Sequence, residues 1–288
     1  MSYEQNGAVA TGSEPPKSAK PKRRTYQVSQ IEITEAADSS LLKLIRNATF
    51  ISHGQLISMA VDNGISPYRQ AAYARVKRYV KTGLVHQIGR VYPHSGAVYS
   101  ITRAGLSVLE AYGEGLVSIT SESERLADPI QAPHFLEINE VRRALQSDPS
   151  MTIERWFTDR EIGSMNYTTA FPYAKDYDAV VQIRRGKQEP IEFGFEYERT
   201  YKALDRYKEV ATAISRERHL TFVLYVTSSA DMVFKLAPLL NCTPVPICLT
   251  PARVIHKDRF GSKVAFLVNG QVTGAPLHDF IAALRNHK

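Results

Sequence analysis

The sequence predicts a mixed α/β (α+β) protein in which two folded units follow a polar N-terminal tail. The chain has 288 residues, 43% of them hydrophobic, which is enough to form more than one core. Helical periodicity dominates residues 39–113 until a β-hairpin pattern appears, whereas residues 130–288 mix period-two and helical segments. Between them, residues 114–129 combine Gly, Ser, Pro and charged residues, a composition that predicts a connector.

Charge and cysteine content narrow the class of protein. The formal net charge of +7 suits a polyanionic partner. The two cysteines, Cys242 and Cys248, indicate neither a disulfide framework nor a four-ligand zinc site, and we interpret both as buried or incidental thiols. No apolar run approaches the roughly 18 residues that span a bilayer, and the N-terminus lacks a signal-peptide core. We therefore expect a cytoplasmic protein without membrane insertion.

Residues 1–38 are predicted to form a disordered basic tail. They are rich in Ser, Gly, Pro and Glu, and they carry the basic run K-S-A-K-P-K-R-R over residues 17–24. Such a segment buries too little apolar surface to offset the entropy lost on ordering. The basic run either steers DNA toward the protein or only keeps the tail solvated, and both interpretations stay open.

Residues 39–113 show the element order of a winged helix-turn-helix, three helices followed by a β-hairpin. The predicted elements are a helix from Leu41, a second over Phe50–Ala60, a third from Ser66 to about Thr82, strands over Leu84–Tyr92 and Ala97–Thr102, and a last helix. Ser52 and Thr102 are the candidate N-caps, and Pro67 suits the first turn of the third helix. The turn Pro93–Gly96 joins the two strands.

The third helix is the predicted DNA-binding element. Its apolar face carries Ala72, Val76, Tyr79 and Val80. No acid occurs between Asp62 and Glu110, a window with seven Arg or Lys residues, and this exclusion is an electrostatic footprint for DNA. A basic, merely solvated helix and a protein-interaction module are the alternatives. The expected contacts to duplex DNA come from Arg69, Arg75, Lys77, Arg78, Lys81 and Arg90.

Residues 130–288 predict a mixed sheet flanked by helices. The segments are a helix over His134–Leu145, a strand over Met151–Phe157, hairpin strands over 176–183 and 191–198, a helix over Thr200–Arg216, a strand over His219–Val226 and a helix over Ala230–Leu239. This α-β-β-β-α-β-α order is the layout of restriction-endonuclease-like nucleases. Trp156 is expected in the core.

The hairpin concentrates carboxylates. Period two places Glu192, Glu196 and Glu198 on the face opposite Phe193, Phe195 and Tyr197, and the turn over residues 184–190 brings Asp178 beside the last two acids. Clustered carboxylates repel one another unless a cation lies among them, and carboxylate oxygens are the ligands that Mg²⁺ and Mn²⁺ prefer. We expect Asp178, Glu196 and Glu198 to bind such an ion for phosphodiester cleavage. The alternative is a solvated hairpin with an acidic face.

These motifs, in this order, resemble the replication-relaxation family and the related MobC-type mobilisation relaxases over about residues 40–226. The match rests on Arg75–Val85, His134–Leu145, Trp156 with Glu161, and Asp178 followed by Phe195–Thr200. The resemblance implies a winged helix joined to a restriction-endonuclease-like domain. It also implies metal-dependent nicking of DNA at the transfer origin of a mobilisable plasmid or integrative element. Duplex DNA and other relaxosome or coupling proteins would then be the partners in conjugation.

One position departs from the usual nuclease motif. Asp178, Glu196 and Glu198 match the acidic positions of the family, but Glu198 stands where the usual motif has a lysine. Lys202, expected one turn into the next helix, either stabilises charge on the reacting phosphate or is solvated. His134 is either a general base or a structural residue at the start of its helix.

Other functions remain open on the sequence. The chain lacks a His-hydrophobe-His motif, so chemistry built on a His-ligated metal and nucleophilic tyrosines is not supported. Tyr201 and Tyr207 lie nearest the acids, and helix packing explains them equally well. The main alternative is a non-enzymatic winged-helix DNA-binding regulator or replication-associated protein with a degenerate nuclease fold. A third hypothesis is an accessory protein that recruits other transfer proteins.

Overall fold

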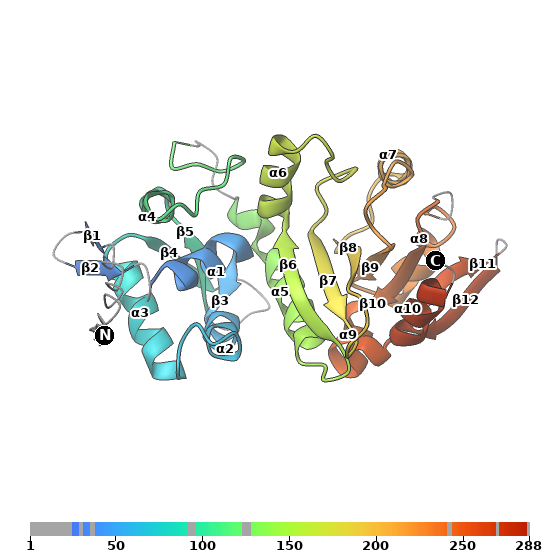
Figure 1. The fold of residues 1–288 in the computed structure, drawn as a ribbon, viewed down its shortest axis with the longest axis horizontal. Helices are drawn as coiled ribbons and strands as arrows, with labels where there is room; N and C mark the ends of the chain where they lie inside the picture. Colours follow the sequence, from blue (N-terminus) through green and yellow to red (C-terminus); the bar gives the residue numbers. More distant parts are fainter. Residues whose placement is uncertain are drawn as a thin grey trace, which may run out of the picture.

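The protein is a mixed α/β structure with a seven-stranded mixed sheet and ten α-helices in its described part, as the sequence predicts. The computed structural model describes residues 25–28, 31–34, 38–90, 96–122, 128–240, 244–268 and 271–286. Figure 1 shows an N-terminal part, coloured blue to green, and a C-terminal part, coloured yellow-green to red, side by side along the longest axis. Helix α5 (Ala132–Gln146) lies between them.

The N-terminal part contains three helices and a β-hairpin in the expected order. Its elements are α1 (Ser40–Ala48), β3 (Ile51–Ser52), α2 (His53–Asp62), α3 (Arg69–Lys81), β4 (Val85–Arg90), β5 (Ala97–Ile101) and α4 (Arg103–Ala111). The three strands form one sheet in the order β3-β5-β4. Ser52 caps α2 in a capping box with Gln55, and Thr102 accepts the backbone N–H of Gly105 at the start of α4. Both predicted N-caps are thereby confirmed.

Part of the predicted tail is ordered. Strands β1 (Thr25–Val28) and β2 (Ile31–Thr34) form an antiparallel pair. Ile33 is fully buried in the N-terminal core, and its carbonyl accepts a 2.7 Å hydrogen bond from the Tyr112 hydroxyl. The prediction of a tail through residue 38 was therefore wrong for these strands, because one well-packed isoleucine outweighs the polar composition around it. The basic run over residues 17–24 lies outside the described residues.

Helix α3 begins three residues later than predicted. Ser66 and Pro67 lie in a bend before it, where the Ser66 hydroxyl donates to the Tyr68 carbonyl. Tyr68 is extended, with φ −160° and ψ 163°, so the first helical residue is Arg69. The predicted end of the first hairpin strand at Tyr92, most of the turn after it, and the side chain of Arg90 lie outside the described residues.

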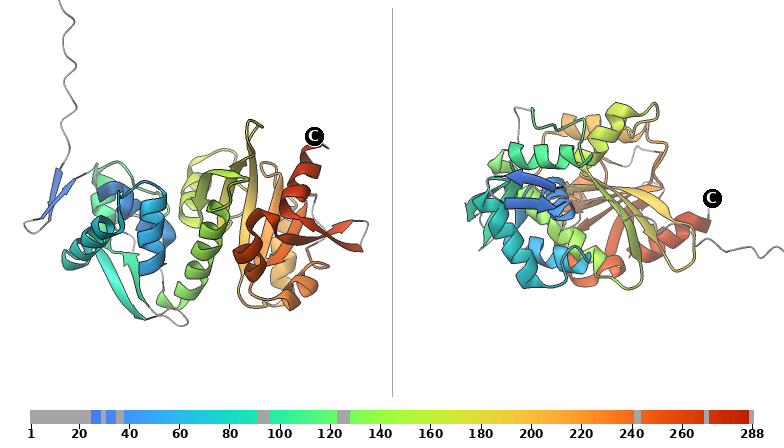
Figure 2. Two further views of the ribbon diagram at one scale, coloured as in Figure 1. Left: turned by 90° about the horizontal axis from the view of Figure 1, so that it is seen from below. Right: turned by 60° about the vertical axis from the view of Figure 1, so that its left-hand side comes forward.

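The C-terminal part has three layers, with helices on both faces of one sheet (Figure 2). The sheet contains β6 (Thr152–Thr158), β7 (Ala179–Arg184), β8 (Ile191–Glu198), β9 (Phe222–Thr227), β10 (Ile247–Pro251), β11 (Lys263–Val268) and β12 (Gln271–Pro276), hydrogen-bonded in that order. Strands β8, β9 and β10 are parallel, and the other pairs are antiparallel. Helices α5, α9 (Ala252–Asp258) and α10 (Leu277–Asn286) cover one face, and α6 (Asp159–Thr168), α7 (Leu204–Ile214) and α8 (Ala230–Leu236) the other.

Two helices differ from the sequence prediction. Helix α6, between β6 and β7, was missed, although its capping box of Thr158 and Glu161 is readable as T-x-x-E in the sequence. Helix α7 begins at Leu204 rather than at Thr200. The backbone N–H of Lys202 donates to the buried Tyr207 hydroxyl at 2.8 Å, a local contact over five residues that holds the chain outside the helix at this point. Trp156 is buried as expected.

Buried polar contacts hold the two parts together. The Asn139 side chain on α5 donates to the Phe50 carbonyl at 2.9 Å, and the Gln55 amide donates to the Leu136 carbonyl at 2.7 Å. Phe50, Val98, Ala132 and Leu136 form an apolar cluster around these bonds. An unpaired buried polar group costs free energy, so these bonds fix the position of α5 relative to Phe50 and Gln55.

The predicted connector forms hydrogen bonds with helix α6 of the C-terminal part. The backbone N–H of Val117 donates to the Ser164 hydroxyl at 2.9 Å, and the Ser118 hydroxyl donates to the Arg160 carbonyl at 2.9 Å. Both acceptors lie on α6. Across the described ranges, no helix combines the length and apolarity needed to cross a membrane.

Replacing Asn139 with alanine tests this junction. Asn139→Ala leaves the Phe50 carbonyl buried without its partner, so the free energy of unfolding should fall by about 1–3 kcal/mol. The better helix propensity of alanine offsets at most about 0.7 kcal/mol of that loss. Urea denaturation measures the change, with exposed Asn63→Ala as the control, expected within about 0.5 kcal/mol of wild type. Equal stability of the two variants would show that the junction bond does not hold the parts together.

Candidate functional site

The acidic residues meet at one end of the sheet, where β7 begins and β8 ends. In the antiparallel pairing, Ala179 stands opposite Phe195, so one residue further along this register Asp178 stands opposite Glu196. The backbone N–H of Tyr197 donates to Asp178 Oδ2 at 2.7 Å and anchors that carboxylate. Figure 1 shows α6 and α7 at this end of the sheet. The predicted proximity of Asp178 to the acids of β8 is therefore present.

Each of these acids is paired with a basic side chain of the protein. Lys175 forms an ion pair with Glu196, and the ammonium group of Lys202 lies 3.0 Å from Glu198 Oε1. His134 Nε2 lies 3.3 Å from Asp178 Oδ1. The sequence analysis expected carboxylates that repel one another until an external cation binds. In the structure two lysine ammonium groups supply positive charge beside Glu196 and Glu198, and His134 adds a third when it is protonated. The charge of Asp178 still raises the pKa of both glutamates.

Lys175, which the sequence analysis missed, is held in place by a buried carboxylate. Glu217 accepts the backbone N–H of Ala174 at 3.0 Å and the Tyr177 hydroxyl at 3.1 Å, which fixes the segment on either side of Lys175. The lysine ammonium also lies 4.7 Å from the centre of the Tyr177 ring. Its only sequence signal was a position three residues before Asp178, and nothing there indicated that the segment folds over β8.

Lys202 lies in the loop before α7, not in the helix where it was predicted. Its ammonium group reaches the buried Glu198 while more than half of its side chain stays exposed. Tyr207 is buried and packs against Tyr201, with ring centres 5.3 Å apart. Tyr207 is thus a packing residue, whereas Tyr201 is half exposed beside Lys202.

Burial changes the acidity of the carboxyls. It raises the pKa of Glu196 to about 7, against the opposing charge of Lys175 and with a further upward contribution from Asp178. Burial likewise raises the pKa of Asp159, at the start of α6, to about 6 and shifts the pKa of Glu198 upward. Lys175 and Glu196 are in ion-pair contact, which lowers the pKa of Glu196. The loss of water on burial has the larger effect, so the pKa of Glu196 stays raised.

The pKa values of His134 and Asp178 shift in opposite directions. Burial alone would lower the pKa of His134, but the hydrogen bond and charge of Asp178 raise it. Burial alone would raise the pKa of Asp178, but His134, the Tyr197 N–H and Lys175 lower it. Each of the two side chains therefore favours the charged form of the other.

The donor chemistry of this cluster suits a hard cation, although its present arrangement favours internal pairing. Within the part of the chain that the structure describes, no three or more His, Cys, Asp or Glu side chains are placed to hold one ion. The carboxylates of Asp178, Glu196 and Glu198 supply only oxygen donors, and the charge of Asp178 influences the pKa of the other two. The ammonium groups of Lys175 and Lys202 lie beside the carboxylates of Glu196 and Glu198.

The basic residues of α3 separate into two groups. Arg69, Lys77 and Lys81 lie on the exposed face together with the half-exposed Tyr73. In contrast, Arg75 donates to the Ile65 carbonyl and Arg78 pairs with the buried Asp38. The exposed face therefore offers three of the six predicted cations, while the guanidinium groups of Arg75 and Arg78 hold the fold around α3.

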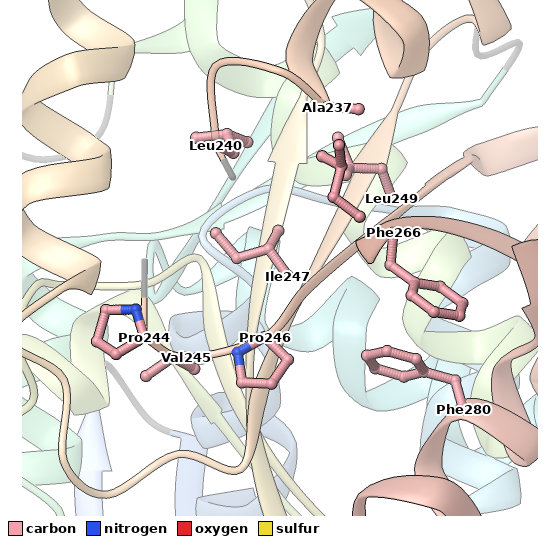
Figure 3. Close-up of a pocket in the computed structure, with 10 residues that line it drawn as sticks. Ala237, Leu240, Pro244, Val245, Pro246, Ile247, Leu249, Phe266 and Phe280 are labelled. Carbon is pink, nitrogen blue, oxygen red and sulfur yellow. The ribbon is translucent and has the colours of Figure 1, made fainter. Parts of the chain in front are cut away.

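A hollow on another part of the sheet lacks comparable chemistry. It has a volume of about 220 Å³ and lies among α8, β10, β11 and α10 (Figure 3). The described side chains that line it are all apolar and include Leu240, Phe266 and Phe280. No lining side chain there can move a proton or bind a phosphate, so the acidic end of the sheet remains the better candidate site.

Comparisons with protein-family models, with curated proteins and with solved structures found no match to this chain.

The raised pKa of Glu196 predicts how stability depends on pH. The pKa of Glu196 is about 7 in the folded protein and 4.5 for an ordinary glutamate. Its contribution to stability is therefore fully present below about pH 4.5 and is lost as the pH rises through 7. In chelator-containing buffer, wild type should lose roughly 3 kcal/mol more than Glu196→Gln between pH 4.5 and 8. Parallel denaturation curves for the two proteins would contradict this, and Glu189→Gln, in the exposed turn, should follow wild type.

Proposed function

We propose that this protein is a metal-dependent DNA endonuclease that nicks one strand at a transfer origin, acting as a relaxase for a mobile element. The observation that supports it most directly is the convergence of Asp178, Glu196 and Glu198 with two lysines and a histidine at one sheet end. The element order α5-β6-β7-β8-α7-β9, with α6 inserted, agrees with a restriction-endonuclease-like layout. The nicking reaction and its location in the cell are inferred from the resemblance described above.

The proposed division of roles follows from charge and position. Asp178, Glu196 and Glu198 would hold Mg²⁺ or Mn²⁺, which when bound polarises the phosphate and activates a water. Lys175 and Lys202, released from their carboxylates, would place positive charge beside the phosphate oxygens as charge develops there. These two lysines then perform the role of the lysine that is missing at position 198.

His134 is suited to the proton transfer. When water adds to phosphorus and the bond to the leaving oxygen breaks, that oxygen needs a proton. His134, whose pKa is raised by Asp178, can donate it from Nε2, and the proton released by the attacking water restores the balance. Hydrolysis then leaves a hydroxyl on one side of the nick and a phosphate on the other.

Duplex DNA would be held by the N-terminal part as a winged helix. The order α1-β3-α2-α3-β4-β5, with a three-stranded sheet, supports this interpretation, and α3 would be the reading helix. Because buried bonds connect this part to α5, and α5 carries His134, DNA held on α3 would stand at a defined place relative to the acids. Other transfer proteins remain expected partners.

A non-catalytic DNA-binding protein is the second candidate. The observation that favours it is the internal pairing of all three acids, which leaves no preformed ion site among the described residues. In that case the cluster would stabilise the sheet end, and only the N-terminal part would act on DNA. The two candidates differ in whether the acids bind an ion.

A nicking assay separates them. Purified protein with Mn²⁺ should convert supercoiled plasmid carrying its own element's origin to the open-circle form. Asp178→Asn, Glu196→Gln and Lys175→Met should each lower the rate about 100-fold or more, because each removes a metal ligand or a charge at the phosphate. Glu189→Gln and Lys187→Met, both in the exposed turn after β7, are the matched controls and should keep the wild-type rate. Absence of both Mn²⁺ binding and nicking in wild type would favour the non-catalytic candidate.

The α3 surface gives a separate prediction. Lys77→Ala and Lys81→Ala should each reduce the salt dependence of duplex binding by about one phosphate contact, since each lysine is exposed on α3. Arg78→Ala should instead lower stability by about 1 kcal/mol, because it removes a partner of the buried Asp38. Fluorescence anisotropy at several salt concentrations and thermal unfolding measure the two effects. A larger loss of binding with Arg78→Ala than with Lys77→Ala, at unchanged stability, would reverse the assignment.

A further inference from the structure

A second hollow lies on the same face of the sheet as the candidate site. Its volume is about 260 Å³, and it is lined by Met165, Asn166, Thr168, Thr169, Phe171, Tyr173, Glu192 and His219. These residues come from the end of α6, the segment after it, β8 and the loop before β9. None of the residues that make up its described lining is Lys or Arg. A phosphate is therefore a poor occupant, and a neutral group suits it better.

Flat rings and hydrogen-bonding groups surround this hollow. The side chain of Phe171 is exposed, with 78% of the residue accessible, and Tyr173 stands edge-on to His219 with ring centres 5.8 Å apart. The Tyr173 hydroxyl is hydrogen-bonded to Glu192, and that bond helps to raise the pKa of Tyr173 to about 12 after the larger effects of burial and of the Glu192 and Glu217 charges. An exposed aromatic ring beside a carboxylate suits a planar ligand that carries N–H donors.

The segment that presents Phe171 is anchored on both sides. Thr169 Oγ1 accepts the backbone N–H of Phe171 at 3.2 Å, and Asn166 Oδ1 accepts the N–H of Tyr173 at 2.9 Å. The Asn166 amide in turn donates to Asp176 Oδ1 at 2.7 Å. These bonds fix the backbone on both sides of Phe171. The segment therefore holds the Phe171 ring exposed to solvent without an apolar core around it.

The distance to the acids fits a few nucleotides. Glu192 and Glu196 lie on the same face of β8, four residues apart, which is about 13 Å along a strand. A stacked nucleic-acid strand advances about 3.4 Å per nucleotide. A strand held at the acids would thus reach this hollow a few nucleotides from the scissile bond.

We propose that this hollow binds one unpaired nucleobase with an exocyclic amino group, stacked on Phe171 and donating to Glu192. The proposal rests on the proposed function, in that the base belongs to the single strand next to the nick. Thymine has no exocyclic amino group, so adenine, cytosine and guanine are favoured over thymine. The site would act by holding the cleaved strand apart from its complement.

Binding of short single-stranded oligonucleotides tests this without cleavage. Anisotropy is measured for labelled oligo-dA, oligo-dC and oligo-dT of equal length, in chelator, with wild type, Phe171→Ala and Glu192→Gln. Phe171→Ala should weaken oligo-dA and oligo-dC binding about 5- to 150-fold, the loss typical of one stacked base. Glu192→Gln should remove the preference over oligo-dT. Phe234→Ala, an exposed phenylalanine on α8, is the matched control and should bind as wild type.

The outcomes distinguish the two proposals. Nicking by wild type with unchanged oligonucleotide binding in Phe171→Ala would overturn the base site and leave the nuclease intact. Base-dependent binding that needs Phe171, without any nicking, would support the base site and reject the nuclease. If Phe171→Ala instead abolishes self-association of the wild-type chain in sedimentation experiments and leaves oligonucleotide binding unchanged, the ring belongs to an interface between copies and the base site is rejected. Thermal unfolding of each variant confirms that it is folded.

Discussion

The antiparallel pairing of β7 with β8 is the constraint on which the candidate site depends. Because Ala179 stands opposite Phe195, both the core side chains and the acids are assigned to their faces at once. A slip of one residue would move Phe193, Phe195 and Tyr197 out of the core and expose them. The apolar face therefore specifies the register, and the register places Asp178 opposite Glu196. Packing of the apolar face of β8 therefore positions the acids that lie on its other face.

Burial and charge compete at this end of the sheet. Glu196 and Glu198 lie among side chains that exclude water, which favours their protonated forms, while Lys175 and Lys202 favour the ionised ones. A buried pair contributes little to stability by itself, because desolvation consumes most of the attraction. What the pairing does provide is a set of three acids and three basic side chains held close together at one end of the sheet.

The junction between the two parts gives the charge cluster a connection to the α3 surface. Helix α5 accepts the Gln55 amide at its Leu136 carbonyl and donates from Asn139 to the Phe50 carbonyl. The same helix presents His134 to Asp178 from its first turn. A rigid helix transmits position without needing a conformational change. The connector, bonded to α6 through Val117 and Ser118, adds a second attachment on the opposite side of the sheet end. The two parts are thereby placed relative to each other by hydrogen bonds at named atoms.

Local pattern was sufficient for the element types and for the acidic face, because period-two alternation and N-cap chemistry depend on near neighbours. These local signals predicted α2, α4, β7 and β8, and they predicted that Asp178 lies near Glu196. The capping signal of α6 was also present in the sequence but was not used. Contacts between distant residues decided the rest. Arg78 pairs with Asp38 and Lys175 with Glu196, each through a partner that sequence spacing does not reveal. Ile33 is likewise buried by residues far along the chain, among them Tyr112, whose hydroxyl donates to the Ile33 carbonyl.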